Sequence, residues 1–292
     1  MNLSNKLVAV SDLIRLKKQY GTVLLLCPTL WSLVMASKGM PDFYLLFIFT
    51  AGCFLMRSAG CAINDIADRN FDVNVERTKD RPIASGRLTI NEAFFVFTIL
   101  VLTAFGLVLT LNTITIKLSF VAILLAVAYP FVKRFSHFPQ VFLGMAFGWG
   151  AVMAWSATTG EIALPAVFFF IANIFWSTAY DTIYALMDIE DDKKIGVKST
   201  AIFFGNHVYK AILISYTLTI VFLALAGFYG GSSEIYFYGI VVLYAFFVLT
   251  TIVITSNLSK VNFLRAFIYN SFYGLLFLLF IYIDFIKDTI FV

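Results

Sequence analysis

Apolar stretches of about twenty residues recur along almost the entire chain and constrain its fold more than any other feature. A helix rises about 1.5 Å per residue, so about twenty apolar residues cross the roughly 30 Å hydrocarbon core of a bilayer. Because 61% of the 292 residues are hydrophobic, an ordinary soluble domain is excluded. The stretches predicted to cross the membrane are 21–37, 43–62, 90–111, 115–132, 138–157, 163–184, 207–229, 234–256 and 265–286. We therefore expect an all-α membrane protein with about nine transmembrane helices.

The basic residues are distributed unevenly between the segments that connect these stretches. If the N-terminus is cytoplasmic, all but four of the 21 Lys and Arg residues fall on the cytoplasmic side. The exceptions are Lys38, Lys117 and Lys287, on the opposite side, and Arg57, within a span. This bias follows the positive-inside rule and supports nine spans with an outward C-terminus. It also accounts for the net charge of +4, so we expect no nucleic-acid partner.

No linker or low-complexity segment interrupts the chain, so residues 1–292 are expected to form one domain. The two longest polar segments, 63–89 and 185–206, both fall on the predicted cytoplasmic side. Connecting segments on a rigid scaffold are where functional residues concentrate. We therefore look for a site in these two segments.

Both polar segments begin with acidic residues at a shared spacing. Asp65, Asp68, Asp72 and Glu76 stand at positions i, i+3, i+7 and i+11, which share one face of a helix. The second segment repeats this spacing with Asp181, Tyr184, Asp188 and Asp192. Carboxylates on one face repel each other unless a cation lies among them, and carboxylate oxygens suit hard cations such as Mg²⁺. Two such faces can hold metal ions with a diphosphate between them.

Composition and spacing alone leave two other interpretations open. The acids can be solvated ends of cytoplasmic helices that pair with nearby Lys and Arg. The chain can also be a secondary transporter whose acids bind a coupling cation. Transporter sites usually lie near the bilayer midplane, however, and most of these carboxylates are predicted just beyond helix ends.

The residues around the acids resemble motifs of the intramembrane aromatic prenyltransferases. Asn64-Asp65-x-x-Asp68-x-x-x-Asp72, followed by ERTKDRPIASGRLT, is similar to the first aspartate-rich motif of that family. YDTIYALMDIEDDKKIGVKSTAIFFG is similar to the second, and YPFVKRFSHFPQVFLGMAFGW resembles a segment of the branch that acts on 4-hydroxybenzoate. The resemblance extends from about residue 15 to residue 270. One departure is the opening Arg15-Leu-Lys-Lys-Gln-Tyr-Gly21, where Lys17 and Gln19 replace the usual Asp and Pro.

The resemblance implies a nine-helix fold around a central cavity, capped on the cytoplasmic side and open laterally to lipid. It implies Mg²⁺-dependent transfer of a polyprenyl group from polyprenyl diphosphate to 4-hydroxybenzoate, at the ring carbon ortho to the hydroxyl. This reaction belongs to ubiquinone biosynthesis in the bacterial inner membrane. Another member of the family with a different aromatic acceptor is the alternative within the same class.

The matching positions imply roles for individual residues. Those expected to hold Mg²⁺ and diphosphate are Asn64, Asp68, Asp72, Asp188 and Asp192, with Asp65, Asp181 and Asp191 nearby. Apart from the resemblance, Arg77, Lys79 and Arg81 are candidates for binding diphosphate, because a guanidinium pairs with phosphate through two hydrogen bonds. Each can equally be a basic residue of the positive-inside bias, the interpretation favoured for Lys79. Tyr184 is the best candidate for stabilising the allylic cation with its ring.

The acceptor carboxylate also needs a cationic partner. Arg134 is the first candidate, because it lies in the matching VKRF segment at a predicted helix end. Lys133, Arg15 and Arg57 are the other candidates. Arg57 is informative because a charge within a span is costly and usually faces a cavity. Asp191 is a candidate for polarising the phenol hydroxyl.

Overall fold

The computed structural model describes residues 3–290, and over that part of the chain it consists of helices without a strand. The α-helices are α1 (Leu3–Leu13), α2 (Tyr20–Ala36), α3 (Phe43–Asp72), α4 (Ile90–Val108), α5 (Thr113–Val132), α6 (Pro139–Thr159), α7 (Leu164–Ala185), α8 (Ile189–Ile195), α9 (Thr200–Phe204), α10 (Val208–Gly230), α11 (Glu234–Ser256) and α12 (Lys260–Ile290). A short 3₁₀ turn (Gly205–His207) joins α9 to α10.

The predicted spans correspond to α2 through α7 and α10 through α12, so the predicted fold class is confirmed. Among the described residues, 8 helical stretches are long and apolar enough to cross a membrane. The remaining predicted span is α2, which is apolar but only 17 residues long. It begins at Tyr20, after the non-helical connection from α1. The predicted number of nine spans is therefore approximate.

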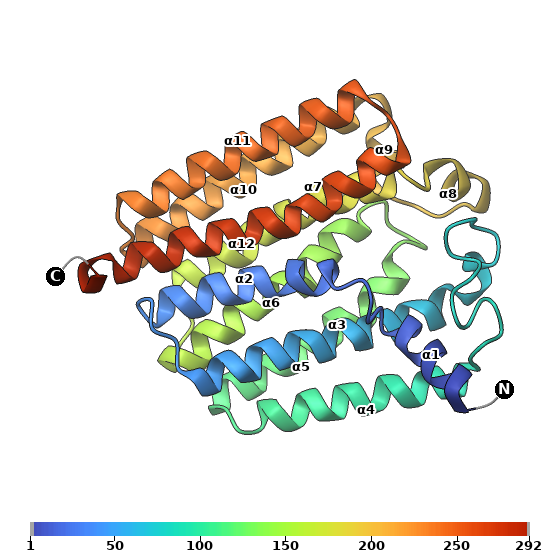
Figure 1. Ribbon diagram of the computed structural model, residues 1–292, viewed down its shortest axis with the longest axis horizontal. Coiled ribbons are helices and arrows are strands. Elements are labelled where there is room, and N and C mark those ends of the chain that lie inside the picture. The colour runs from blue at the N-terminus through green and yellow to red at the C-terminus, as the bar shows by residue number, and fades with distance from the viewer. Residues whose placement is uncertain (1–2, 291–292) are drawn as a thin grey trace.

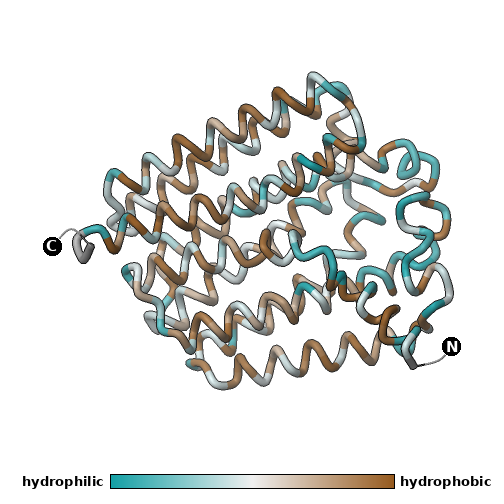
Figure 2. The backbone as a smooth tube through the Cα atoms, viewed as in Figure 1, coloured by the Kyte–Doolittle hydropathy of each residue, from teal (hydrophilic) through white to brown (hydrophobic). Residues whose placement is uncertain are grey.

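The long helices lie side by side, and the two chain termini lie at opposite ends of the bundle (Figure 1). The segments after α3 and after α7 gather with α1 at the end of the bundle where the chain begins. Figure 2 shows hydrophilic residues concentrated at this end, which we call the polar end. It consists of α1, residues 14–19, 73–89, 133–138 and 186–207, and the adjoining ends of α3 and α7. The two polar segments predicted to carry the site are thus brought to the same end.

Helix α3 is longer than a membrane crossing requires. Its 30 residues extend over about 45 Å, compared with about 30 Å for a hydrocarbon core. The last turns therefore project from the membrane, and they carry the first acidic motif. The helix ends at Asp72, where the Thr78 hydroxyl donates to the Asp72 carbonyl at 3.1 Å. This hydrogen bond satisfies one of the carbonyls that a helix end leaves without a partner.

Helix α7 occupies the centre of the bundle and α4 its margin. In the most apolar stretch of α7, 61% of the residues are buried inside the protein, compared with 11% in that of α4. A side chain at Gly144 of α6 would lie 2.7 Å from the Ile174 backbone, so the absence of a side chain lets α6 approach α7 closely. Trp31 of α2 stacks on Trp176 of α7 with ring centroids 5.1 Å apart. This packing fixes the helix that carries the second acidic motif.

Candidate active site

A cavity of about 950 Å³ opens among α2 through α7, with α12 also contributing to its wall. At the polar end its wall is charged, and the predicted site residues that line it there are Arg15, Asn64, Arg77, Arg81 and Tyr184. Farther into the bundle the wall becomes apolar, with Phe49 and Met56 of α3, Phe105 of α4 and Phe120 of α5. From Asp65 to Phe49, α3 lines the cavity over about 24 Å. The cavity therefore suits a ligand with a charged head and a long apolar tail.

Arg77 connects the two acidic motifs across the polar end. Its Nε donates to both carboxylate oxygens of Asp188, at 2.8 and 3.1 Å, and its Nη1 donates to the Tyr184 hydroxyl at 2.8 Å. The guanidinium also lies 4.9 Å from the centre of the Tyr184 ring. Arg77 and Asp188 are 111 residues apart in the chain, so this contact exists only in the folded protein.

Basic side chains also pair with each acid of the first motif. Arg81 Nη1 lies 2.9 Å from an oxygen of Asp72 and 3.3 Å from Asp65, which Arg15 also contacts at 2.6 Å. The remaining member is Asp68, which accepts hydrogen bonds from Lys133 and, at 3.0 Å, from Asn64. Asp68, Asp72 and Asp188 are thus held directly behind cavity-lining residues. Each of these carboxylates therefore has a basic partner in the folded protein.

One part of the predicted acidic face is wrong. Because α3 ends at Asp72, Glu76 lies beyond the helix, is exposed, and pairs with Lys79. In the second motif α7 ends at Ala185, and α8 begins only after Asp188. Asp188 and Asp192 are therefore not on the same helix as Tyr184. The second motif therefore does not form one continuous helical face. The break between α7 and α8 separates Asp188 and Asp192 from Tyr184.

The donor set at the polar end fits Mg²⁺. Asp65 Oδ2 and Asp68 Oδ1 are buried without a hydrogen-bond partner. Among the described residues, no three acidic, His or Cys side chains converge as a metal cluster. Mg²⁺ does not require such a cluster, because it usually takes one or two carboxylates and completes its coordination with water and substrate phosphate. Oxygen ligands of this kind match its preference.

The pKa of Asp192, in the second motif, is also relevant to cation binding. Burial, and next the neighbouring charge of Asp188, raises the pKa of Asp192 to about 6. Burial disfavours the ionised carboxylate most, and the charge of Asp188 adds to this effect. A cation bound beside Asp192 would favour its ionised form.

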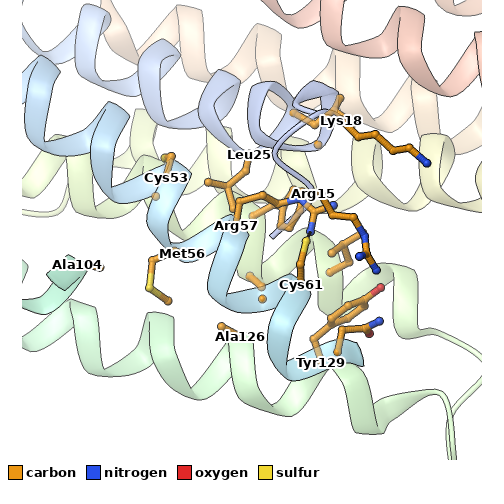
Figure 3. A pocket seen from close by; sticks show the side chains of 18 of the residues that line it. Arg15, Lys18, Leu25, Cys53, Met56, Arg57, Cys61, Ala104, Ala126 and Tyr129 are labelled. Carbon is orange, nitrogen blue, oxygen red and sulfur yellow. Dashed lines mark hydrogen bonds between the residues drawn. The ribbon is translucent and has the colours of Figure 1, made fainter. Parts of the chain in front are cut away.

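Arg57 lies deeper in the cavity than the acidic motifs. Its Nη1 donates to Cys61 Sγ at 2.7 Å, and its guanidinium lies 5.9 Å from the centre of the Phe147 ring. Among the described residues, no carboxylate lies within ion-pair distance of it. Figure 3 shows Arg57 beside Cys61 on α3, with Arg15 and Tyr129 nearer the polar end. An arginine within the bundle that has no acidic partner at ion-pair distance is available to bind an anionic group.

The first candidate for the acceptor carboxylate occupies a different place. The Arg134 guanidinium donates to the Ala67 carbonyl at 2.7 Å and lies over the Phe131 and Phe71 rings. It is not in the wall of the cavity that the described residues form. Lys133 is held by Asp68 and Arg15 by Asp65. Of the four candidates, the structure brings Arg57 to the cavity without an acidic partner.

Asp181 and Tyr129 line the cavity, whereas Asp191 does not among the residues described. Asp191 lies on α8 and pairs with Lys194 at 3.5 Å. Asp181 forms no ion pair within the described part of the chain and faces the same cavity as Arg57. Sequence reasoning placed Asp181 only near the metal and did not select Tyr129. The available signal for Tyr129 was its position as the first residue of YPFVKRF.

Comparison with known proteins supports one family. Residues 25–282 match the model of the UbiA prenyltransferase family. A 4-hydroxybenzoate octaprenyltransferase from Histophilus somni is 47% identical over 271 residues, which cover 93% of this chain and 94% of that protein. An enzyme of the same name from Psychromonas ingrahamii is 48% identical over 268 residues, covering 91% and 92% of the two chains.

Solved structures share the fold. The structure of a UbiA homologue from Aeropyrum pernix K1 has a TM-score of 0.77 and 22% identity, and the match covers 89% of this chain and 97% of that one. A UbiA homologue from Archaeoglobus fulgidus bound to GPP and Mg²⁺ has a TM-score of 0.66 and 18% identity, covering 92% and 99%. With the match to the family model and the close relatives, these findings show that the chain belongs to the UbiA prenyltransferase family.

Proposed function

We propose that this protein transfers an octaprenyl group from octaprenyl diphosphate to 4-hydroxybenzoate. In this reaction the allylic carbon–oxygen bond of the diphosphate breaks, and the diphosphate leaves with the bonding electrons. A carbon–carbon bond then forms at the ring carbon ortho to the hydroxyl, and that carbon loses its proton. The names of the relatives at 47–48% identity support the donor and the acceptor.

The observation that carries the proposal is the single cavity that combines three environments. Its polar end brings together both acidic motifs, its interior holds the unpaired cation Arg57, and its far part is apolar. A prenyl diphosphate needs the first and the third of these environments. A benzoate acceptor needs the second. The continuity of the cavity allows both substrates to meet within it.

The residues proposed to hold Mg²⁺ and diphosphate are Asn64, Asp68, Asp72, Asp188 and Asp192. When bound, Mg²⁺ would neutralise the charge that develops on the departing diphosphate. Arg77 and Arg81 are proposed to exchange their carboxylate partners for diphosphate oxygens, since a guanidinium binds either group through paired hydrogen bonds. The solved relative bound to GPP and Mg²⁺ supports the use of a divalent cation by this fold.

The acceptor is proposed to lie between Arg57 and Asp181. The guanidinium binds the acceptor carboxylate, and the Asp181 carboxylate accepts a hydrogen bond from the phenol hydroxyl. That hydrogen bond enriches the ring in electrons and favours attack by the ortho carbon. Asp181 replaces Asp191 in this role, because Asp191 pairs with Lys194 outside the cavity wall.

Tyr184 is proposed to stabilise the allylic cation. Its ring lines the cavity, and Arg77 and Phe267 hold it from two sides, with a distance of 4.6 Å between the Tyr184 and Phe267 ring centroids. The apolar wall excludes water from the cation until the ring attacks. We further propose that the protein lies in the bacterial inner membrane with the polar end in the cytoplasm, as the distribution of basic residues favours.

A reconstituted assay tests the proposal. Purified protein in lipid vesicles with Mg²⁺ should convert octaprenyl diphosphate and 4-hydroxybenzoate to prenylated 4-hydroxybenzoate, identified by mass spectrometry. Asp181→Asn should lower turnover with this acceptor far more than Asp191→Asn. If the protein prenylates homogentisate or a naphthoate and not 4-hydroxybenzoate, the proposed acceptor is wrong. Cation-coupled solute flux without consumption of a prenyl diphosphate would instead support a transporter.

A further inference from the structure

Gly21, the second residue of α2, lies against the Arg57 guanidinium. A Cβ atom built on Gly21 would fall 2.7 Å from both Arg57 Nε and Arg57 Nη2, and 3.1 Å from Cζ. Real Cβ atoms essentially never approach a heavy atom this closely. The guanidinium therefore occupies the space that any side chain at position 21 would need.

Few other contacts determine where this guanidinium lies. Cys61 accepts one hydrogen bond from it, and the Phe147 ring packs near it. None of the ion pairs among the described residues involves Arg57. The other cavity-lining arginines are held differently, since Arg77 and Arg81 are each fixed by carboxylates. The position of Arg57 thus depends on packing, and Gly21 leaves the space that the guanidinium occupies.

The backbone of Gly21 does not require glycine. Its φ angle is not in the left-handed region, and it lies within a regular helix. A helical backbone of this kind accepts alanine, which has a higher helix propensity than glycine. The atoms that an added methyl group meets are the end of a flexible side chain and not backbone. Replacement by alanine should therefore displace Arg57 and leave the fold intact.

We propose that Gly21 is a positioning residue that sets the location of Arg57 and thereby the selectivity for a carboxylate-bearing acceptor. This inference rests on the proposed function, in which Arg57 binds the acceptor carboxylate. Gly21 itself does not contact the reacting atoms. Because Gly21 has no side chain, the Arg57 guanidinium can lie at this place in the cavity wall.

Steady-state kinetics of Gly21→Ala test this role. The KM for 4-hydroxybenzoate should rise about tenfold or more, because a charge-assisted hydrogen bond contributes about 1.5–3 kcal/mol and 1.4 kcal/mol corresponds to a factor of ten. The KM for octaprenyl diphosphate should change less than about twofold, roughly the scatter expected away from a contact. Gly60→Ala is the matched control, since Gly60 also lines the cavity on a helix and an added Cβ there meets no atom within 4 Å.

Two comparisons separate positioning from a general structural effect. With 4-hydroxybenzamide, which lacks the carboxylate, wild type and Gly21→Ala should have the same KM. In an Arg57→Lys background, adding Gly21→Ala should cause no further change in KM, because lysine has no guanidinium fork to meet the added methyl group. Equal changes in the KM of both substrates, or the same KM in Gly21→Ala and Gly60→Ala, would overturn the inference.

The failure of the inference is distinguishable from that of the proposed function. If the wild-type protein does not prenylate 4-hydroxybenzoate, the proposed function is wrong. If it does so and prefers the benzoate to the benzamide, but Gly21→Ala keeps that preference, Gly21 alone loses its role.

Discussion

At the scale of single residues, the acids of the two motifs differ in what holds them. Asp65 is fixed by Arg15 and Arg81, whereas Asp68 is buried with one oxygen that lacks a partner. Asp188 meets Arg77, which lines the cavity. Glu76 is exposed and lies outside the site. Equal spacing in the sequence therefore does not mean equal roles.

We expect Asp68→Ala and Asp188→Ala each to lower prenyl transfer at saturating Mg²⁺ by at least about 100-fold. Removing one carboxylate takes away a proposed metal ligand and leaves Lys133 or Arg77 without its partner, and such losses at charged sites cost several kcal/mol. The rate of product formation in membranes measures the effect. Glu76→Ala is the control and should retain wild-type activity. Full activity of both aspartate variants would exclude the proposed metal site.

The raised pKa of Asp192 predicts pH-dependent metal binding. Because burial and the Asp188 charge raise this pKa to about 6, protons compete with Mg²⁺ below that pH. Mg²⁺ affinity should rise as the pH increases from about 5 to about 7 and then level off, with a shallower rise in Asp192→Asn. Without metal, ionising Asp192 disfavours the folded state, so stability should fall between pH about 4 and about 6. Calorimetric titration with Mg²⁺ measures the first effect, and a pH-independent affinity would contradict it.

At the scale of helices, a buried carboxylate joins α11 to α12 at the end opposite the site. Asp284 of α12 accepts hydrogen bonds from the backbone N–H groups of Ser233 and Tyr236, at 2.9 and 3.2 Å. These groups lie at the start of α11, where N–H groups have no partner within their own helix. An acidic residue also interacts favourably with the positive end of the helix dipole. Asp284 thus caps a helix to which it does not belong.

Asp284→Ala should lower the melting temperature in detergent by several degrees. The substitution removes the acceptor of the Ser233 and Tyr236 N–H groups and of the Ser233 hydroxyl, and a buried donor left unsatisfied costs about 1–3 kcal/mol. Asp284→Asn, which keeps one carbonyl acceptor, should lose less. A fluorescence-monitored thermal scan provides the measurement. The KM values of both substrates should not change, and an unaltered melting temperature would show that the cap adds no stability.

At the scale of the whole molecule, the charge distribution and the fold agree. The two polar segments and the N-terminal helix gather at one end of the bundle, and the C-terminus lies at the other (Figure 1). The same end contains the charged part of the cavity wall and most of the basic residues. In the proposed orientation, the diphosphate head would lie on the cytoplasmic side and its prenyl tail in the apolar interior.

We expect cysteine-specific labelling to place the polar end in the cytoplasm. In a background without Cys27, Cys53 and Cys61, a cysteine at position 79 should react with a membrane-impermeant maleimide only after the inner membrane is permeabilised. A cysteine at the exposed position 161, between α6 and α7, should react in intact spheroplasts. The physical reason is that Lys and Arg near spans are retained on the cytoplasmic side. The reverse labelling pattern would invert the proposed orientation.

The sequence by itself determined the features that depend on local composition. Apolar length predicted the positions of the membrane helices, because the cost of burying polar groups in lipid applies to each segment separately. The spacing of the acids and their family resemblance located both motifs, and the distribution of basic residues predicted the orientation. Resemblance also included Arg15 and Gly21, but gave no reason for the glycine.

Only the tertiary structure decided which charges meet. Lys133, expected at the acceptor, pairs with Asp68, and Arg134 lies over two phenylalanine rings away from the cavity wall. Arg57 faces the cavity because Gly21, from another helix, leaves room for it. Such contacts join residues far apart in the chain, and their energies depend on distance and burial, which no local pattern encodes.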